Sequence, residues 1–253
     1  MELAVHDIGL AYGDFKVLQG VSFNATLGGI HGMIGPNGAG KSTLFSVLSG
    51  LMRADTGEVR FGDAAFGHMA ADKRAQLGLG RTFQIPREFR HLTVRDNLLV
   101  GPRRQPGESL IDLFLAPAKV RRFEEAARAR AEALIGFLKL GAVADKPAGG
   151  LSGGQKKLLE LGRALMSEPT FILLDEPYAG VNPVLIEEIS ERIREINRER
   201  GIGFLIIEHN LMALNRLVED LYVLDSGRLI AHGDPAGVLE HPQVRAAYMG
   251  AAA

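Results

Sequence analysis

Three short apolar runs stand out along the chain, at residues 30–34, 171–174 and 204–207, and each is followed at once by glycine or polar residues. Runs of four or five residues bounded in this way are typical of strands buried on both faces. Amphipathic segments between them predict helices, so the order indicates an α/β fold with a largely parallel sheet. Ligands bind such sheets outside the carboxyl ends of the strands, which directs attention to the residues after each run.

The remaining periodic segments complete this pattern. Residues 184–200 form the clearest predicted helix, with an apolar stripe at Leu185, Ile189, Ile193 and Ile196. Residues 221–224 and 228–231 predict a hairpin around an Asp-Ser-Gly turn. Residues 2–25 alternate between apolar and polar positions around Tyr12-Gly13-Asp14, which predicts an N-terminal antiparallel β layer.

The region from 87 to 167 differs in character, because it has few strand-like runs and a helical stretch at 121–140. We interpret 87–167 as a helical subdomain inserted into an α/β core made of residues 1–86 and 168–253. Residues 102–130 hold seven basic and four acidic side chains, a net charge of +3. Aromatic residues are not interleaved with these charges, so a solvated helix face is favoured over a nucleic-acid patch.

Composition narrows the classes of function. Lys and Arg number 29 against 30 Asp and Glu, a net charge of −1, so no basic field recruits nucleic acid and we expect no such partner. The chain has no cysteine, which excludes a disulfide framework and thiolate metal ligands. No run approaches the ~18–20 apolar residues of a membrane helix, and the N-terminus lacks signal-peptide character. We therefore expect a cytoplasmic protein that serves any membrane process through another chain.

The strongest chemical signal is a phosphate-loop pattern that follows the first apolar run. Its residues are Gly35, Pro36, Asn37, Gly38, Ala39, Gly40, Lys41, Ser42 and Thr43. Glycines allow successive backbone N–H groups to converge on an anion, and the helix that follows adds positive potential. Lys41 is expected to reach the β- and γ-phosphates and the Ser42 hydroxyl to ligate Mg²⁺. The pattern predicts a nucleoside triphosphate site.

Two carboxylates end the second apolar run. Asp175 and Glu176 follow Phe171-Ile172-Leu173-Leu174, and burying adjacent acids is costly unless they meet a cation or a catalytic task. We predict that Asp175 holds the magnesium and that Glu176 polarises the attacking water. The alternative is an acidic pair that caps the next turn.

A second anion-binding helix start is predicted at Ser152-Gly153-Gly154-Gln155, where Ser152 is the expected N-cap. An ordinary capped turn has the same appearance, so the residues alone leave both interpretations open. Two phosphate cradles in one chain point to a dimer.

These motifs, in this order, resemble the ATP-binding subunits of ABC transporters over nearly the whole chain, and Leu151–Gln155 matches that family's signature motif. The resemblance implies that Tyr12 stacks on adenine, that Gln84 contacts magnesium with Ser42 and Asp175, and that His209 contacts the γ-phosphate. It also implies that Ser152, Gly153, Gly154 and Gln155 of one subunit face the phosphate loop of another. Taken singly, Tyr12, Gln84 and His209 each also fit a purely structural role.

Within the family, the chain looks like the importers of branched-chain and other hydrophobic amino acids. This likeness rests on Arg81-Thr82-Phe83-Gln84, the long segment 101–121, Ala179–Pro183 and the ending Tyr248-Met249-Gly250. One departure is Asn182, where many ABC ATPases carry aspartate. The resemblance implies transmembrane permease subunits, a second ATP-binding subunit identical to this one or a sister of it, and a solute-binding protein. It also implies a peripheral position at the cytoplasmic face of the membrane.

Several alternatives remain beside this interpretation. Urea or amide importers and lipid or lipopolysaccharide exporters share the motifs, and a non-transport ABC ATPase is a more distant possibility. A P-loop kinase or GTPase would not need the signature residues or His209. Phe83, Ile85, Phe89 and Leu92 could form an apolar patch that docks a permease, or could equally belong to the core.

Overall fold

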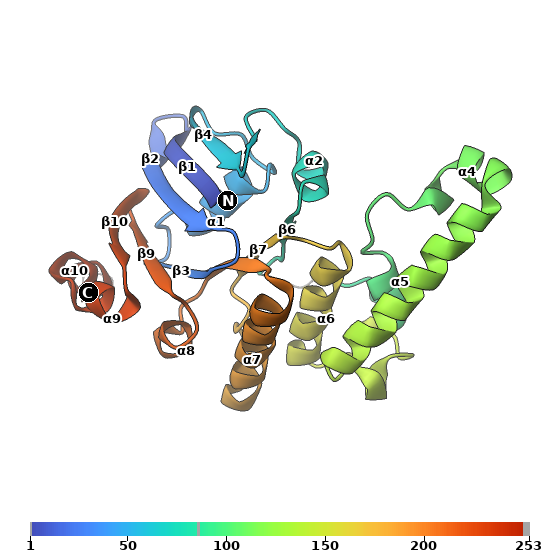
Figure 1. The fold of residues 1–253 in the computed structure, drawn as a ribbon. Helices are drawn as coiled ribbons and strands as arrows, with labels where there is room; N and C mark the ends of the chain where they lie inside the picture. The colour runs from blue at the N-terminus through green and yellow to red at the C-terminus, as the bar shows by residue number, and fades with distance from the viewer. Residues whose placement is uncertain (1, 85–86, 250–253) are drawn as a thin grey trace. The chain divides into compact units, whose positions relative to one another are not determined.

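A computed structural model describes residues 2–84 and 87–249 of the chain (Figure 1). Ile85, Pro86 and Gly250, which belong to sequence motifs named above, lie outside the described residues. The chain divides into two compact units. The core unit comprises Met1–Gln84, Thr170–Ala179 and Pro183–Ala253, and the helical unit comprises Ile85–Pro169 and Gly180–Asn182.

A six-stranded sheet forms the centre of the core unit. Its strands are β3 (Ile30–Ile34), β6 (Leu79–Arg81), β7 (Phe171–Asp175), β8 (Gly203–Ile207), β9 (Asp220–Asp225) and β10 (Arg228–Gly233). The order is β10-β9-β3-β8-β7-β6, and every neighbouring pair is parallel except the antiparallel β9–β10 hairpin. All residues of β3, β7 and β8 are buried, so the three strands predicted from apolar runs are confirmed, as is the hairpin.

A second sheet, which is antiparallel, contains the first two strands of the chain. It is built in the order β2-β1-β4-β5 from β1 (Glu2–Tyr12), β2 (Phe15–Thr26), β4 (Thr56–Phe61) and β5 (Ala64–Ala65). The predicted antiparallel layer is therefore confirmed, with Gly13 at a φ of 60° in the turn between β1 and β2.

The hydrophobic core of this unit lies between the two sheets, where helix α1 (Lys41–Leu48) contacts both β2 and β7. Leu44, Phe45 and Leu48 of α1 are fully buried in a cluster with residues of both sheets. Burying side chains of this size contributes roughly 1.5–3 kcal/mol each. The start of α1 is thereby fixed to the edge of the six-stranded sheet where its parallel strands end.

The other helices of the core unit are α2 (Ala71–Gln76), α7 (Pro183–Arg200), α8 (Leu211–Asn215), α9 (Pro235–Glu240) and α10 (Pro242–Met249). Helix α7 confirms the predicted helix, since Ile189, Ile193 and Ile196 are buried and Leu185 is half-buried.

The helical unit is built from α3 (Val94–Leu99), η1 (Pro106–Glu108), α4 (Leu110–Leu115), α5 (Pro117–Phe137), η2 (Gly141–Val143), η3 (Ala148–Gly150) and α6 (Gly153–Met166). The predicted helix at 121–140 was wrong at both ends. Pro117 starts α5 earlier, because its fixed φ suits the first turn of a helix. The helix ends at Phe137, since Lys139 adopts a φ of 53° and the Leu140 amide turns back to the Ile135 carbonyl. No helix in the described part of the chain has the length and apolar character that crossing a membrane requires.

Candidate nucleotide site

The phosphate loop leaves the buried strand β3 after Ile34 and enters α1 at Lys41. Gly38 and Gly40 adopt φ values of 82° and 99°, which side chains disfavour. A Cβ on Gly35 would lie 2.0 Å from the carbonyl oxygen of Leu224, so the loop can pack against β9 only with glycine there. The first turn of α1 has no acidic residue, and its free N–H groups therefore keep their attraction for an anion.

The Lys41 ammonium lies inside this loop. Its Nζ donates to the carbonyl oxygens of Gly35 at 2.7 Å and Pro36 at 2.9 Å, and the side chain is buried. Burial lowers the pKa of Lys41, while the nearby Glu176 and Asp175 carboxylates oppose that shift. The cation is thus held at the point where a phosphate would enter, by two carbonyl groups that a phosphate can replace.

A pocket of about 480 Å³ opens beside the loop, within the core unit. Tyr12, Gln84, Glu176 and His209 line it together with Asn37–Thr43 of the loop. The structure therefore brings sequence-predicted residues from five separate segments to one cavity.

Aromatic side chains form one wall of this pocket. Tyr12 is 57% exposed, and Phe15, at 69% exposed, lines the same cavity from the other end of the β1–β2 turn. Sequence reasoning missed Phe15. Its position three residues after Tyr12, across a two-residue turn, was the available signal.

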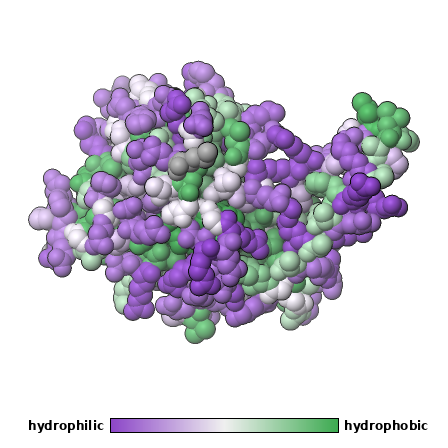
Figure 2. Space-filling model, in the orientation of Figure 1, coloured by the Kyte–Doolittle hydropathy of each residue, from purple (hydrophilic) through white to green (hydrophobic). Residues whose placement is uncertain are grey.

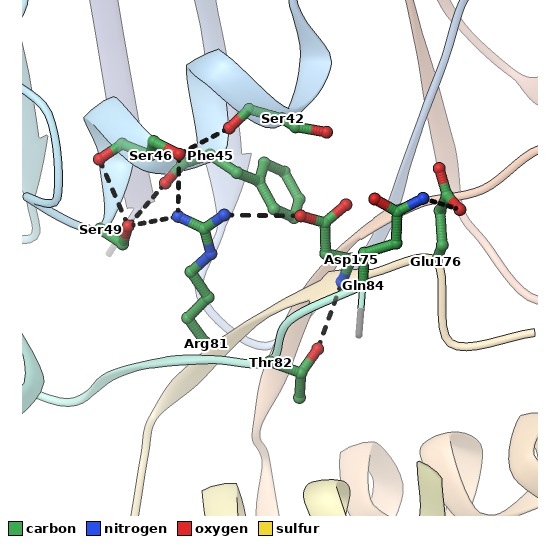
Figure 3. A network of polar contacts seen from close by, with 9 residues as sticks. All are labelled: Ser42, Phe45, Ser46, Ser49, Arg81, Thr82, Gln84, Asp175 and Glu176. Atoms are coloured by element: carbon green, nitrogen blue, oxygen red, sulfur yellow. Dashed lines mark hydrogen bonds and ion pairs between the residues drawn. The ribbon is translucent and has the colours of Figure 1, made fainter. Parts of the chain in front are cut away.

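Glu176 stands at the carboxyl end of β7 with its side chain bound from two sides. The Gln84 amide Nε2 donates to Glu176 Oε2 at 2.8 Å (Figure 3), and His209 Nε2 lies 3.1 Å from Oε1. The Glu176 backbone has a φ of 49°, a conformation that costs on the order of 1–3 kcal/mol in residues other than glycine. The Glu176 amide donates to the Ile207 carbonyl at 2.9 Å, which ties this strained turn to β8.

Asp175 is buried beside Arg81, a residue to which the sequence motif gave no role. A terminal nitrogen of Arg81 lies 3.5 Å from Asp175 Oδ2, and the other donates to the Oγ of Ser49, the C-cap residue of α1, at 2.8 Å (Figure 3). The Asp175 amide also donates to Thr82 Oγ1 at 3.2 Å. These contacts join β6, β7 and α1 around the carboxylate that we expected to meet magnesium. A basic residue ending a short apolar strand was the signal that could have identified Arg81.

Sequence reasoning also missed the carboxylate of Glu208. This residue comes directly after β8, at the same edge of the sheet as Asp175, the last residue of β7. Glu208 is buried and accepts hydrogen bonds from the backbone amides of Tyr178 at 2.6 Å, His209 at 2.9 Å and Asn210 at 3.3 Å. Burial raises the pKa of Glu208, although the three amide bonds act in the opposite direction. Glu208 therefore fixes the backbone on both sides of the Glu176–His209 contact.

The signature segment lies in the helical unit, at the start of α6. Ser152 is the N-cap, as predicted, and forms a reciprocal capping box with Gln155. Ser152 Oγ accepts from the Gln155 amide at 3.3 Å, and the Ser152 amide donates to Gln155 Oε1 at 3.0 Å. Ser152 and Gly153 are exposed, whereas Gly154 is buried. The first turn of α6 has no acidic residue, so the positive end of the helix dipole is not offset there.

The apolar patch considered at 83–92 divides between the two units. Phe89 and Leu92 of the helical unit are 45% and 38% exposed, so they are not core residues. In the core unit, the guanidinium of Arg81 lies over the Phe83 ring, with the Arg81 Cζ atom 5.2 Å from the centre of that ring.

Comparison with known proteins identifies the family. The family model for ABC transporters matches residues 18–179. A probable branched-chain amino acid transport ATP-binding protein LivG from Methanocaldococcus jannaschii is 40% identical over 243 residues, covering 94% of this chain and 93% of that protein. The chain belongs to the ABC transporter ATP-binding family. It is an ABC-type ATPase.

Solved structures agree with this assignment of the cassette. A nucleotide-free ATP-binding cassette from an ABC transporter matches with a TM-score of 0.85 and 40% identity, covering 98% of this chain and 99% of that one. A cassette in its ADP conformation matches with a TM-score of 0.84 and 39% identity, covering 99% of both. The predicted fold class is thereby confirmed, and the cassette is a nucleotide-binding protein.

The relatives carry more than one transport name. A lipopolysaccharide export system ATP-binding protein LptB from Acidithiobacillus ferridurans is 38% identical over 234 residues, covering 92% of this cassette and 90% of that protein. A family model for the branched-chain amino acid ATP-binding cassette transporter matches residues 228–253 of the cassette.

The donor atoms that the cassette offers near its phosphate loop suit magnesium. The Ser42 hydroxyl, the Gln84 amide and the Asp175 carboxylate all supply oxygen, the ligand type that Mg²⁺ prefers. Among residues 2–84 and 87–249, no cluster of three His, Cys, Asp or Glu side chains could hold a metal by itself. Mg²⁺ is usually bound through one or two carboxylates together with nucleotide phosphates, and a donor set with the single carboxylate Asp175 fits that arrangement.

Proposed function

We propose that this ABC ATPase energises the uptake of branched-chain or other hydrophobic amino acids through transmembrane permease subunits. The match of residues 228–253 to the branched-chain amino acid cassette model carries this choice among ABC systems. Lipopolysaccharide or lipid export is the second candidate, because LptB proteins match at 38% and 34% identity.

Nucleotide binding is assigned to the phosphate loop and the aromatic wall. Backbone amides of residues 35–43 and the Lys41 ammonium bind the phosphates, and Tyr12 stacks on adenine. Ser42, Gln84 and Asp175 hold Mg²⁺. When bound, that ion would neutralise negative charge on the nucleotide phosphates.

Glu176 is the catalytic base in this proposal. Its carboxylate orients a water molecule and accepts its proton as the water oxygen bonds to the γ-phosphorus. The bond between that phosphorus and the β–γ bridging oxygen breaks, and ADP leaves with the electron pair. Gln84 and His209 hold the two carboxylate oxygens of Glu176, which explains how its orientation is maintained. His209 also stabilises charge that develops on the γ-phosphate.

The composite site is completed by a second ATP-binding subunit. The start of α6, formed by Ser152, Gly153, Gly154 and Gln155, binds the γ-phosphate held by the phosphate loop of the other subunit. Residues 87–167 act as the signature-bearing subdomain, and 1–86 with 168–253 act as the nucleotide-binding core. Closure around ATP is transmitted to permease subunits, so the chain acts at the cytoplasmic face of the membrane. A periplasmic or extracellular solute-binding protein delivers the amino acid to those permease subunits from the other face, and is an indirect partner of this chain.

The transported solute can be tested in the cells that make the protein. A chromosomal Glu176→Gln replacement is compared with Glu240→Gln, which changes an exposed carboxylate on α9. We expect uptake of radiolabelled leucine, isoleucine or valine to fall at least about tenfold in the first strain only. Unchanged amino-acid uptake with less lipopolysaccharide at the cell surface would instead favour the export system.

A further inference from the structure

Helix α4 of the helical unit carries large apolar side chains that face solvent. Leu110 and Ile111 are 72% and 71% exposed, and Phe114 and Leu115 are each 81% exposed. With Leu113, at 42%, they form what we call the apolar crest. None of the six residues of α4 is buried. Figure 2 shows hydrophobic side chains gathered at this end of the helical unit.

The local hydrogen bonds hold the crest in this exposed orientation. Ser109 caps α4 by accepting from the Asp112 amide at 3.3 Å. Asp112, the one charged residue of the helix, is bound through both carboxylate oxygens to Lys119 of α5 at 3.0 and 3.1 Å. The polar side of α4 is thus attached to α5, and its apolar side chains remain in water. Contiguous exposed apolar groups of this kind mark interaction surfaces rather than ordinary protein surface.

Positive charge accompanies the crest. Residues 102–130 carry a net charge of +3, although Arg130 is paired with Glu168 outside this range. Three of their four acidic side chains are paired locally, Asp112 with Lys119, Glu124 with Arg128 and Glu125 with Arg121. Arg104 and Arg122 form no ion pair within the described ranges of the chain. The crest and its neighbouring arginines are therefore suited to a partner that presents an apolar region next to negatively charged groups.

The composition and size of the crest favour a lipid surface over a protein. Protein interfaces bury about 800 Å² per partner from some 20–30 residues, and their anchors are enriched in Tyr, Trp and Arg. The crest consists of Leu, Ile and Phe side chains from one six-residue helix, and it has no Tyr or Trp. Leu and Phe side chains that enter the boundary between headgroups and acyl chains, with basic residues on the headgroups, are typical of interfacial membrane binding.

We propose that the apolar crest of α4 inserts into an anionic phospholipid bilayer while Arg104 and Arg122 contact the headgroups. The chain then contacts the membrane itself, in addition to any contact made through permease subunits. This contact does not depend on which solute is transported, since all of its residues lie in the helical unit and outside the nucleotide pocket.

Flotation of the purified full chain with lipid vesicles tests this proposal. Vesicles of equal parts phosphatidylglycerol and phosphatidylcholine are compared with vesicles of phosphatidylcholine alone. We expect binding to the anionic vesicles to be at least about tenfold stronger, and to weaken as salt is raised. The crest variant Phe114→Ser with Leu115→Ser is expected to lose at least about tenfold in vesicle affinity.

Two control variants distinguish insertion of the crest from non-specific hydrophobic adsorption and from electrostatic attraction to the headgroups. Val184→Ser with Met212→Ser removes apolar residues of the core unit that are 81% and 74% exposed, and it is expected to bind vesicles like the wild type. Arg104→Ser with Arg122→Ser is expected to reduce binding to the anionic vesicles alone. Circular dichroism and ATP hydrolysis are measured for the crest variant, to establish that it is folded.

Three results would overturn the proposal. One is a wild-type chain that does not float with anionic vesicles, and another is a folded crest variant that floats as well as the wild type. The third is self-association of the wild type that the crest variant loses, without vesicle binding, which would assign the crest to a second copy. Unchanged amino-acid uptake in the Glu176→Gln strain, together with intact flotation of the purified chain, would instead contradict only the proposed transport function.

Discussion

The side-chain amide of Gln84 donates a hydrogen bond to the Glu176 carboxylate at 2.8 Å, although 92 residues separate the two in sequence. Gln84 lies three residues beyond β6 and Glu176 directly follows β7, and these two strands are parallel neighbours. His209 approaches the other carboxylate oxygen from the segment after β8. The ends of three adjacent strands therefore fix the orientation of one carboxylate.

We expect Gln84→Ala to lower kcat for ATP hydrolysis by roughly ten- to a hundredfold, because Glu176 loses one of the groups that orient it. Gln84 is also a proposed magnesium ligand, so the Mg²⁺ concentration that gives half the maximal rate should rise. Steady-state phosphate release over a magnesium titration measures both effects. Gln243→Ala, at an exposed position on α10, is the matched control. An unchanged kcat for Gln84→Ala would show that this hydrogen bond has no part in turnover.

Much of the core unit followed from sequence pattern, because its central strands are buried on both faces. Residues 204–207 are uniformly apolar and residues 30–34 are apolar apart from the buried His31, and the glycine or polar residues after both runs mark the strand ends where the site forms. The ends of α5 could not be predicted in the same way. They depend on the Pro117 start and on the left-handed backbone of Lys139, a residue type that gives no such signal.

The candidate site was predictable where residue type and order form a motif, as for Lys41 and Glu176. Arg81, Phe15 and Glu208 were missed because their roles depend on packing between distant segments. Glu208 binds the amide of Tyr178, which is 30 residues away. No local sequence pattern predicts that such a carboxylate will be buried and bound by backbone amides.

Tyr12→Ala should weaken ATP binding by about tenfold, since stacking of a base on an aromatic side chain contributes ~1–3 kcal/mol. Tyr12→Phe keeps the ring and should bind ATP within about twofold of the wild type. Phe15→Ala tests whether the second aromatic of the pocket contributes to the same wall. Calorimetric titration with ATP measures all three variants. Equal affinity of the Tyr12→Ala variant and the wild type would remove the adenine role from Tyr12.

Glu208 should make the free energy of unfolding depend on pH. Burial raises the pKa of Glu208 in the folded chain above its value when unfolded, so the folded state holds this proton more tightly. Its contribution to stability is therefore fully present below the unfolded pKa of about 4.3 and is lost as the pH rises through the folded pKa.

We expect Glu208→Gln to remove that pH dependence. The variant should also lose about 1–3 kcal/mol, because a glutamine cannot accept from all three amides that Glu208 binds. Urea unfolding of both proteins from about pH 4 to 8 gives the two stability curves, with Glu240→Gln as the exposed control. Parallel curves for the wild type and Glu208→Gln would contradict this assignment.

Dimerisation should require both ATP and the exposed start of α6. Light scattering of a Glu176→Gln chain is expected to show a doubling of mass when saturating Mg-ATP is added. Adding Ser152→Arg should keep this chain monomeric with ATP still bound, because a long side chain would block the surface that meets the other subunit. Dimers that form equally well with Arg at position 152 would place the interface elsewhere.

The central claim is that Glu176 promotes ATP cleavage in the pocket beside Lys41. The most direct measurement combines ATP binding and single-turnover hydrolysis for Glu176→Gln. This substitution replaces the carboxylate by an amide of nearly the same shape. We predict ATP affinity within about threefold of the wild type and a rate lower by roughly 10²–10⁴-fold, the usual contribution of a general base. Hydrolysis at the wild-type rate by Glu176→Gln would contradict the account.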